Sequence, residues 1–126
     1  MKVDQHTKLT EIQETFNKQF PHLRIEFYGR PHDPGEGTSD RDRLDHERTL
    51  GDVTKPISVH QLQFDGNMTI NALESKLNEE LGLHAQVFRR SGNLWLQTTA
   101  TDNWTLDDAN RKGGHSEELF EEQQRK

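Results

Sequence analysis

Hydrophobic residues near the start of the chain recur at the spacing of a helix and then change to the spacing of a strand. Between Thr7 and Phe20 they stand three or four positions apart, as on one face of an amphipathic helix. Pro21 ends this helix, because a proline ring disfavours helical backbone at the residue before it. Residues 23–28 then alternate between apolar and polar side chains. The pattern predicts a helix within Thr7–Phe20, with Thr7 as its N-cap, and a half-buried strand over 23–28.

The same order of patterns returns in the second half of the chain. Residues 59–64 are rich in strand formers, and a turn at 65–67 precedes a second apolar stripe. We expect Thr69 or Asn67 to cap this second helix and Gly82 to end it. The stripe residues of the two helices are Leu9, Ile12, Phe16 and Phe20, and Ile70, Leu73, Leu77 and Leu81. The central members of each stripe, Ile12, Phe16, Leu73 and Leu77, should lie at a helix–sheet interface.

Two further strands follow, and a short helix closes the second half. Residues 84–90 and 93–99 have strand composition and are separated by Ser91-Gly92, which predicts a hairpin with a two-residue turn. Thr105-x-x-Asp108 resembles a capping box in which Asp replaces the usual Glu, so a helix should begin near Thr105.

The two halves are similar enough to suggest an internal duplication. Residues 1–30 align with 62–90 at an offset of 61 positions, with one late gap, and Thr49-Leu-Gly-Asp52 returns as Thr105-Leu-Asp-Asp108. A chance match between two amphipathic helix–strand units is the alternative. Two βαβ units suggest an α+β ferredoxin-like sandwich, with two helices on one face of a mostly antiparallel sheet. We predict one domain over 1–112, with repeat halves about 1–53 and 57–112, an extra C-terminal hairpin strand and a short helix.

Composition divides the chain into a small core and two polar segments. Hydrophobic residues make up 29% of the 126 residues and charged residues 30%, so the apolar side chains must concentrate where the core forms. Residues 29–48 and 113–126 are nearly free of large apolar side chains. Their polarity and glycine content do not offset the entropy of ordering them. We therefore expect a mobile loop over 29–48 and a flexible tail over 113–126.

Charge and residue usage exclude several classes of function. The formal net charge of −6 disfavours binding to a phosphate backbone, and the absence of cysteine excludes disulfides and thiolate chemistry. The N-terminus has no secretory pattern, and no segment approaches the roughly 20 apolar residues of a membrane span. The sequence predicts a cytoplasmic protein without a membrane partner.

Aromatic residues of the predicted hairpin point to a contact surface. Pairing across Ser91-Gly92 sets Phe88 opposite Trp95, and directly opposed residues share a face of the sheet. The same alternation turns Val87, Leu94 and Leu96 toward the helices, and the repeat places Tyr28 with the aromatic pair. Because a ferredoxin-like sheet has one open face, the aromatic group is either exposed or covered by the loop or tail. As a contact surface for a protein partner or a second copy, it comprises Tyr28, Phe88, Arg90 and Trp95.

Stacking of these aromatics on single-stranded nucleic acid is a further alternative, because Arg89 and Arg90 lie beside them. The acidic surroundings and the lack of an aromatic–basic RNA-recognition motif argue against it.

The long loop and the 98–105 segment are the other candidates for chemistry. The loop carries metal-ligating side chains at His32, Asp33, Asp40, Asp42, Asp45, His46 and Glu47. Their spacing does not fit a calcium loop, and interleaved arginines compensate the carboxylates. Residues 98–105 are rich in hydroxyls and could bind a small ligand, but a strand end leading to a helix cap explains them more simply. No nucleophile elbow, phosphate-binding glycine loop or HExxH motif is present, and the seven histidines are scattered. We predict no enzyme activity, no cofactor and no metal site.

Residues 87–106, with the run Thr-Asp-Asn-Trp-Thr-Leu at their end, resemble a segment of a family of small bacterial proteins of unknown function. Residues 20–28, Phe-Pro-His-Leu-Arg-Ile-Glu-Phe-Tyr, and the Pro-His pair that follows them are similar to the same family. The resemblance implies a bacterial, cytoplasmic origin and supplies no ligand, activity or catalytic residue.

Two functional hypotheses follow. The first is a non-catalytic cytoplasmic protein-interaction module that uses the open sheet face. The second is a small-ligand or metal-binding protein that uses the 30–48 loop and the 98–105 segment.

Overall fold

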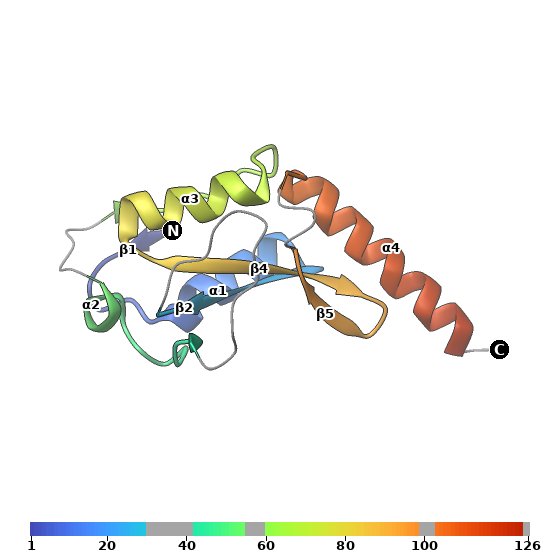
Figure 1. Cartoon of the computed structure of the whole chain (residues 1–126), viewed down its shortest axis with the longest axis horizontal. Coiled ribbons are helices and arrows are strands. Elements are labelled where there is room, and N and C mark those ends of the chain that lie inside the picture. Colours follow the sequence, from blue (N-terminus) through green and yellow to red (C-terminus); the bar gives the residue numbers. More distant parts are fainter. Residues whose placement is uncertain (30–41, 55–59, 99–102, 125–126) are drawn as a thin grey trace.

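The computed structural model describes residues 1–29, 42–54, 60–98 and 103–124, which form a mixed α/β structure with two antiparallel sheets and four helices (Figure 1). The elements in chain order are β1 (Lys2–Val3), α1 (Leu9–Gln19), β2 (Leu23–Tyr28), α2 (Leu50–Val53), β3 (His60–Gln61), α3 (Ile70–Leu81), β4 (His84–Ser91), β5 (Leu94–Gln97) and α4 (Leu106–Gln124).

The ends of the two stripe helices follow from local hydrogen bonds. α3 has the predicted limits, because the Thr69 hydroxyl accepts from the Ala72 amide at 3.0 Å and Gly82 adopts a left-handed φ of 68°. α1 begins at Leu9, and its N-cap is Lys8 rather than the predicted Thr7. The Thr7 hydroxyl instead accepts from the backbone amide of Asp4 at 3.0 Å, which holds Thr7 in the preceding turn.

The strands divide into two sheets. β1 pairs with β3 in a short two-stranded sheet, whereas β2, β4 and β5 form a three-stranded sheet with β4 at its centre. α1 packs on β2, and both α3 and α4 pack on β4. In Figure 1, α3 runs along β4, and α4 continues past the end of that strand toward the C-terminus.

One face of the larger sheet carries the core. Leu23, Ile25, Phe27, Ala85 and Val87 lie on this helix face and belong to the main hydrophobic cluster. The predicted interface residues Ile12, Phe16, Leu73 and Leu77 are all fully buried in the same cluster. The stripe predictions are therefore confirmed. Arg24, Glu26, Tyr28, His84, Gln86 and Phe88 alternate with these strand residues and lie on the opposite side, here called the second face.

The starts of the helices pair with one another in a pattern that recurs. Lys8 forms a β-bridge with Thr49, and Thr69 forms one with Thr105, so α1 starts beside α2 and α3 starts beside α4. The backbone hydrogen bonds around the two bridges also correspond. The Leu9 amide donates to the Arg48 carbonyl and the Ile70 amide to the Trp104 carbonyl, both at 2.9 Å. In the reverse direction, the Leu50 amide donates to the Thr7 carbonyl at 2.8 Å and the Leu106 amide to the Met68 carbonyl at 3.0 Å. These matched bonds support reading the two halves as repeats.

A close backbone crossing accompanies each bridge, and one partner in each crossing is glycine. The Gly51 amide donates to the Gln5 carbonyl at 2.8 Å, and a Cβ on Gly51 would lie 2.9 Å from that oxygen. In the second half the glycine is on the other of the two crossing segments. The Asp107 amide donates to the Gly66 carbonyl at 3.0 Å, and a Cβ on Gly66 would overlap the Asp107 carboxylate. Each crossing thus contains one glycine. In the first half it lies in the second crossing segment, at Gly51, and in the second half it lies in the first crossing segment, at Gly66.

α2 was not predicted as a helix, although the Thr49–Asp52 tetrapeptide repeats the start of α4. Its start is a complete capping box: the Thr49 hydroxyl accepts from the Asp52 amide at 3.3 Å, and the Asp52 carboxylate accepts from the Thr49 amide at 3.2 Å.

The C-terminal segment differs from the predicted flexible tail. Residues 113–124 continue α4, which forms one 19-residue helix. Gly113 and Gly114 lower the helix propensity of this segment, yet they also let it approach His22 closely, since a Cβ on Gly113 would lie 2.9 Å from the His22 carbonyl oxygen. Close packing therefore compensates for weak propensity.

The predicted mobile loop is described only in part. Residues 30–41, with the candidate metal ligands His32, Asp33 and Asp40, lie outside the described residues. The end of the loop pairs with β2: the Gly29 amide donates to the Asp42 carbonyl and the Leu44 amide to the Phe27 carbonyl, both at 2.8 Å.

Candidate functional site

The hairpin that carries the candidate surface turns one residue later than predicted. β4 and β5 are joined by Gly92-Asn93, so Ser91 pairs with Leu94 and Arg90 pairs with Trp95. Gly92 has a φ of 61°, which suits glycine at the first central position of a II′ turn. With Ser91-Gly92 as the loop, serine would occupy that position.

The shift preserves the predicted faces but changes the neighbours. Phe88 pairs with Gln97 rather than with Trp95, and Trp95 lies opposite Arg90. Because the turn moved by one residue, β5 slid by two relative to β4, and every β5 side chain kept its side of the sheet. Phe88, Arg90 and Trp95 therefore share the second face, where Phe88 and Trp95 are diagonal neighbours rather than a direct aromatic pair.

The four predicted partner-binding residues differ in their exposure. Tyr28 and Phe88 are buried, at 1% and 6% of their possible exposed area, although neither belongs to the main core cluster. Trp95 and Arg90 are partly exposed. The part of the predicted aromatic surface that reaches solvent is thus the end formed by Trp95 and Arg90.

Two arginines hold Trp95 in place. The guanidinium carbon of Arg24 lies 5.5 Å from the ring centroids of both Phe88 and Trp95, and that of Arg90 lies 5.3 Å from the Trp95 centroid. These cation–π contacts cover Phe88 and fix the orientation of the indole. We call Arg24, Phe88, Arg90 and Trp95 the tryptophan–arginine cluster.

Carboxylates and carbonyls in turn position both guanidinium groups. Arg24 donates to Glu26 Oε1 at 3.0 Å, and Arg90 Nε donates to the Gly92 carbonyl at 3.0 Å and lies 3.6 Å from Glu117 Oε1. Because each cation already has an anionic partner, the cluster presents a rigid aromatic surface rather than a free positive charge.

A groove of about 370 Å³ lies beside this cluster, between α1 and the second face. It is lined by Thr10, Gln13, Glu14, Asn17, Arg24, Glu26 and Trp95. The lining is polar apart from Trp95, which makes the indole the main apolar contact that the groove offers.

β5 exposes two leucines that were predicted to face the helices. Leu94 and Leu96 lie on the helix-face side of the sheet as expected, yet they are 60% and 44% exposed. The helices pack mainly on β2 and β4, so β5 extends past their cover at the edge of the sheet. The predicted side of the sheet is therefore correct, but the helices do not cover these leucines, because they do not extend over the edge strand.

The outer edge of β5 has no partner strand among the described residues. The Thr98 amide donates to the Val87 carbonyl at 3.2 Å, so the backbone amide and carbonyl of Thr98 point toward β4. Alternate residues of an antiparallel strand point their backbone groups to opposite sides. Leu96 and Leu94 therefore also face β4, and the amide and carbonyl of Trp95 face outward.

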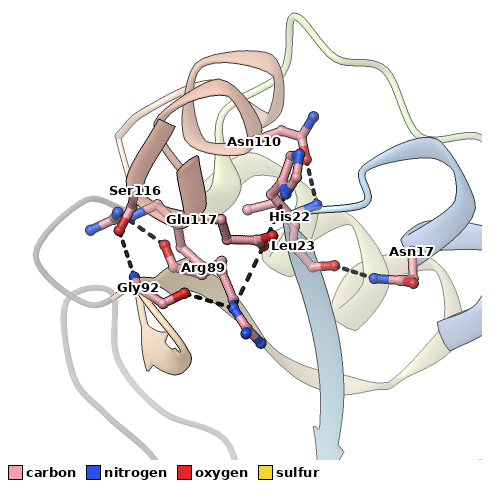
Figure 2. Close-up of polar contacts among 9 residues, drawn as sticks. Asn17, His22, Leu23, Arg89, Gly92, Asn110, Ser116 and Glu117 are labelled. Carbon is pink, nitrogen blue, oxygen red and sulfur yellow. Dashed lines mark hydrogen bonds and ion pairs between the residues drawn. The ribbon is translucent and has the colours of Figure 1, made fainter. Parts of the chain in front are cut away.

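α4 supports the hairpin through polar contacts that were not predicted (Figure 2). The His22 amide donates to Asn110 Oδ1 at 2.8 Å, and the Gly92 amide donates to the Ser116 hydroxyl at 2.6 Å. Glu117 Oε1 lies 3.0 Å from His22 Nδ1, so it connects the start of β2 with Arg90. The helix thereby holds the hairpin turn in a fixed position relative to β2.

A second, smaller hollow of about 250 Å³ lies near the end of β2. Its lining includes Tyr28, Leu44, Arg48, Asp52 and His84. The buried Tyr28 hydroxyl makes no hydrogen bond to any residue that the structure describes.

Among the described residues, no group of three or more His, Asp or Glu side chains is placed to hold a metal ion. In the same part of the chain, no helix is both long and apolar enough to cross a membrane.

Comparison with protein-family models, with curated proteins and with solved structures found no match to this chain.

Sequence reasoning missed Arg24 and Glu117 as members of the site. Arg24 could have been found, because strand alternation places it on the same face as Tyr28. Glu117 had no comparable signal, since its role depends on how α4 crosses the sheet.

Proposed function

We propose that this chain is a non-catalytic, cytoplasmic protein-interaction module, and that its contact surface is the hairpin end of the three-stranded sheet. The exposed leucines and the outward backbone of β5 carry this proposal, and the tryptophan–arginine cluster borders them. Membership of the bacterial family that the sequence resembles is part of the same proposal.

The chemistry of this edge supports the proposal. Natural sheets protect an edge strand with charges, proline or a bulge, because an unpaired edge is a template for another strand. Residues 91–98 contain no charged residue and no proline, and two leucines project from the strand. An edge that has exposed apolar side chains and no neighbouring strand among the described residues is suited to strand addition, in which backbone bonds give affinity and side chains give specificity.

Site-specific photo-crosslinking tests this proposal. A benzophenone amino acid placed at Leu94 should give a defined crosslinked product in the source cell, whereas the same group at the exposed Lys18 of α1 should not. Trp95→Ala in the Leu94 probe should weaken the product, because truncation of a tryptophan at such a site commonly costs about 2 kcal/mol or more of binding energy. Equal labelling from both positions, or none from Leu94, would contradict the proposal.

We also propose that the fold is a variant of the ferredoxin-like sandwich. The β-α-β order of both halves and the antiparallel β1–β3 pairing support this interpretation. The described strands lie in two sheets, whereas the sandwich has one. Amide hydrogen bonds that join β1 or β3 to the larger sheet, measured by NMR, would support the sandwich, and their absence would leave two separate sheets.

The second candidate function is binding of a small ligand. Tyr28 favours it, because this residue lines the 250 Å³ hollow and its buried hydroxyl has no hydrogen bond to a described residue, although burial normally requires one. NMR titration with a fragment library should then shift the signals of Tyr28 and His84 together. A library without any hit at these two residues would count against this function.

A further inference from the structure

The β5 edge has a sequence that reads almost the same in both directions. From Asn93 to Gln97 it is Asn-Leu-Trp-Leu-Gln, with an amide at each end, leucines inside them and Trp95 at the centre. Two copies of such a strand related by a two-fold axis would place like beside like. A symmetric dimer needs a patch that is complementary to itself, and an uncharged strand with leucines on both sides of its centre meets this need.

Backbone geometry limits the ways in which two copies can pair. The outward amide and carbonyl of Trp95 must meet outward groups of the other copy, so an antiparallel pair can be centred on Leu94, Trp95 or Leu96. Centring on Leu94 would pair Trp95 with Asn93, which belongs to the turn rather than to the strand. Centring on Trp95 sets Leu94 opposite Leu96 of the other copy and pairs the two tryptophans. Centring on Leu96 would set the exposed Leu94 opposite Thr98, which is buried. The Trp95-centred register matches apolar with apolar side chains.

Charge also favours a second copy over a charged partner. The whole chain carries −6, so most pairs of identical surfaces would repel each other. Residues 91–98 carry no charge, and the nearby Arg90 is already beside Glu117. Two copies can therefore meet at β5 without placing like charges opposite each other, whereas an acidic or basic peptide would gain little there.

We propose that two copies of this chain associate through antiparallel pairing of their β5 strands, centred on Trp95, to form one continuous six-stranded sheet. The Leu94 and Leu96 side chains of both copies form an apolar cluster on the helix-face side. The two Trp95 side chains meet on the second face. This inference rests on the proposed function and names its partner.

Two matched double variants test the dimer and its register by analytical ultracentrifugation. In the proposed register, Leu94→Lys/Leu96→Lys sets lysine opposite lysine twice, and self-association should weaken by at least about tenfold. Leu94→Lys/Leu96→Glu carries as many charges, but sets lysine opposite glutamate twice, so it should still dimerise. Both positions are exposed, so both variants should retain the wild-type circular dichroism spectrum.

The outcomes separate this inference from the proposed function. A wild-type dimer with a monomeric Lys/Lys variant and a dimeric Lys/Glu variant supports the inference. A dimeric Lys/Lys variant places the interface elsewhere and overturns it, and a monomeric Lys/Glu variant overturns the Trp95-centred register. A wild-type chain that stays monomeric at several hundred micromolar also overturns it. If the Leu94 probe then crosslinks a different protein, the interaction module stands and only its partner changes.

Discussion

At the scale of single residues, the site combines arginines that have anionic neighbours with a buried hydroxyl that has no hydrogen bond to a described residue. Arg24 and Arg90 both contact the Trp95 ring and both have anionic neighbours, Glu26 and Glu117. A tryptophan held in this way loses little conformational freedom when a partner binds, which favours its use as an anchor. Tyr28 differs from these arginines, because its buried hydroxyl has no hydrogen-bond partner among the described residues.

Tyr28→Phe should therefore leave stability unchanged or raise the free energy of unfolding by about 1 kcal/mol, since an unpaired buried hydroxyl is unfavourable. Tyr28→Ala, which also removes the ring, should lower it by several kcal/mol. Urea denaturation of both variants measures the difference. A loss of more than about 1 kcal/mol in Tyr28→Phe would show that the hydroxyl has a partner.

Phe16→Ala tests the core that positions the sheet. Phe16 is fully buried, and its ring centroid lies 5.3 Å from those of Phe20 and Phe64. The substitution should lower the free energy of unfolding by about 3–5 kcal/mol. Phe120→Ala, at a partly exposed position of α4, is the control and should cost much less. A change below about 1 kcal/mol at Phe16 would mean that the helix stripe does not face the core.

At the scale of elements, α4 shows how packing can override propensity. Its middle contains Gly113-Gly114 and few apolar side chains, which in isolation favour a frayed end. In the folded chain, Gly113 lies against the His22 backbone, and Asn110, Ser116 and Glu117 bind the hairpin and the start of β2.

Gly113→Ala should loosen the docking of α4 even though alanine is the better helix former by about 1 kcal/mol. Its Cβ would lie 2.9 Å from the His22 carbonyl oxygen, which cannot move without the strand. Gly114→Ala is the comparison variant, because its Cβ would meet the His22 ring rather than the backbone. The ring can turn at the expense of its contact with Glu117, without moving the strand. Amide exchange over residues 106–124 should accelerate in Gly113→Ala and much less in Gly114→Ala. Equal or slower exchange in Gly113→Ala would contradict the docking argument.

Periodicity predicted the elements with strong local signals and missed those that depend on packing. The stripes of α1 and α3, the Thr69 cap and the Gly82 end could be read from spacing and local chemistry. The hairpin was predicted but its turn was displaced by one residue, because the preference for glycine at the first turn position was not used. The docked length of α4 and the burial of Tyr28 depend on contacts between distant segments, which spacing does not reveal.

At the scale of the whole molecule, the two halves share a scheme in which the starts of paired helices cross closely. Each crossing leaves no room for a side chain on one of its two segments. The first half meets this requirement with Gly51 and the second half with Gly66. The alignment of residues 1–30 with 62–90 indicated this similarity from sequence. The separation of the strands into two sheets was not indicated, because it depends on which distant segments pair. The exposure of β5 was not indicated either, because it depends on how far the helices extend over the sheet.

The most direct test of the β5 contact surface is the exchange rate of the Trp95 backbone amide at two protein concentrations, measured by NMR. In the monomer this amide faces outward and should exchange rapidly, and pairing with a second copy should slow it at high concentration. The Leu96 amide, which faces β4, is the internal control and should be protected at both concentrations. Slower exchange of Trp95 alone at high concentration is the predicted result, and rapid, concentration-independent exchange of Trp95 would contradict the account.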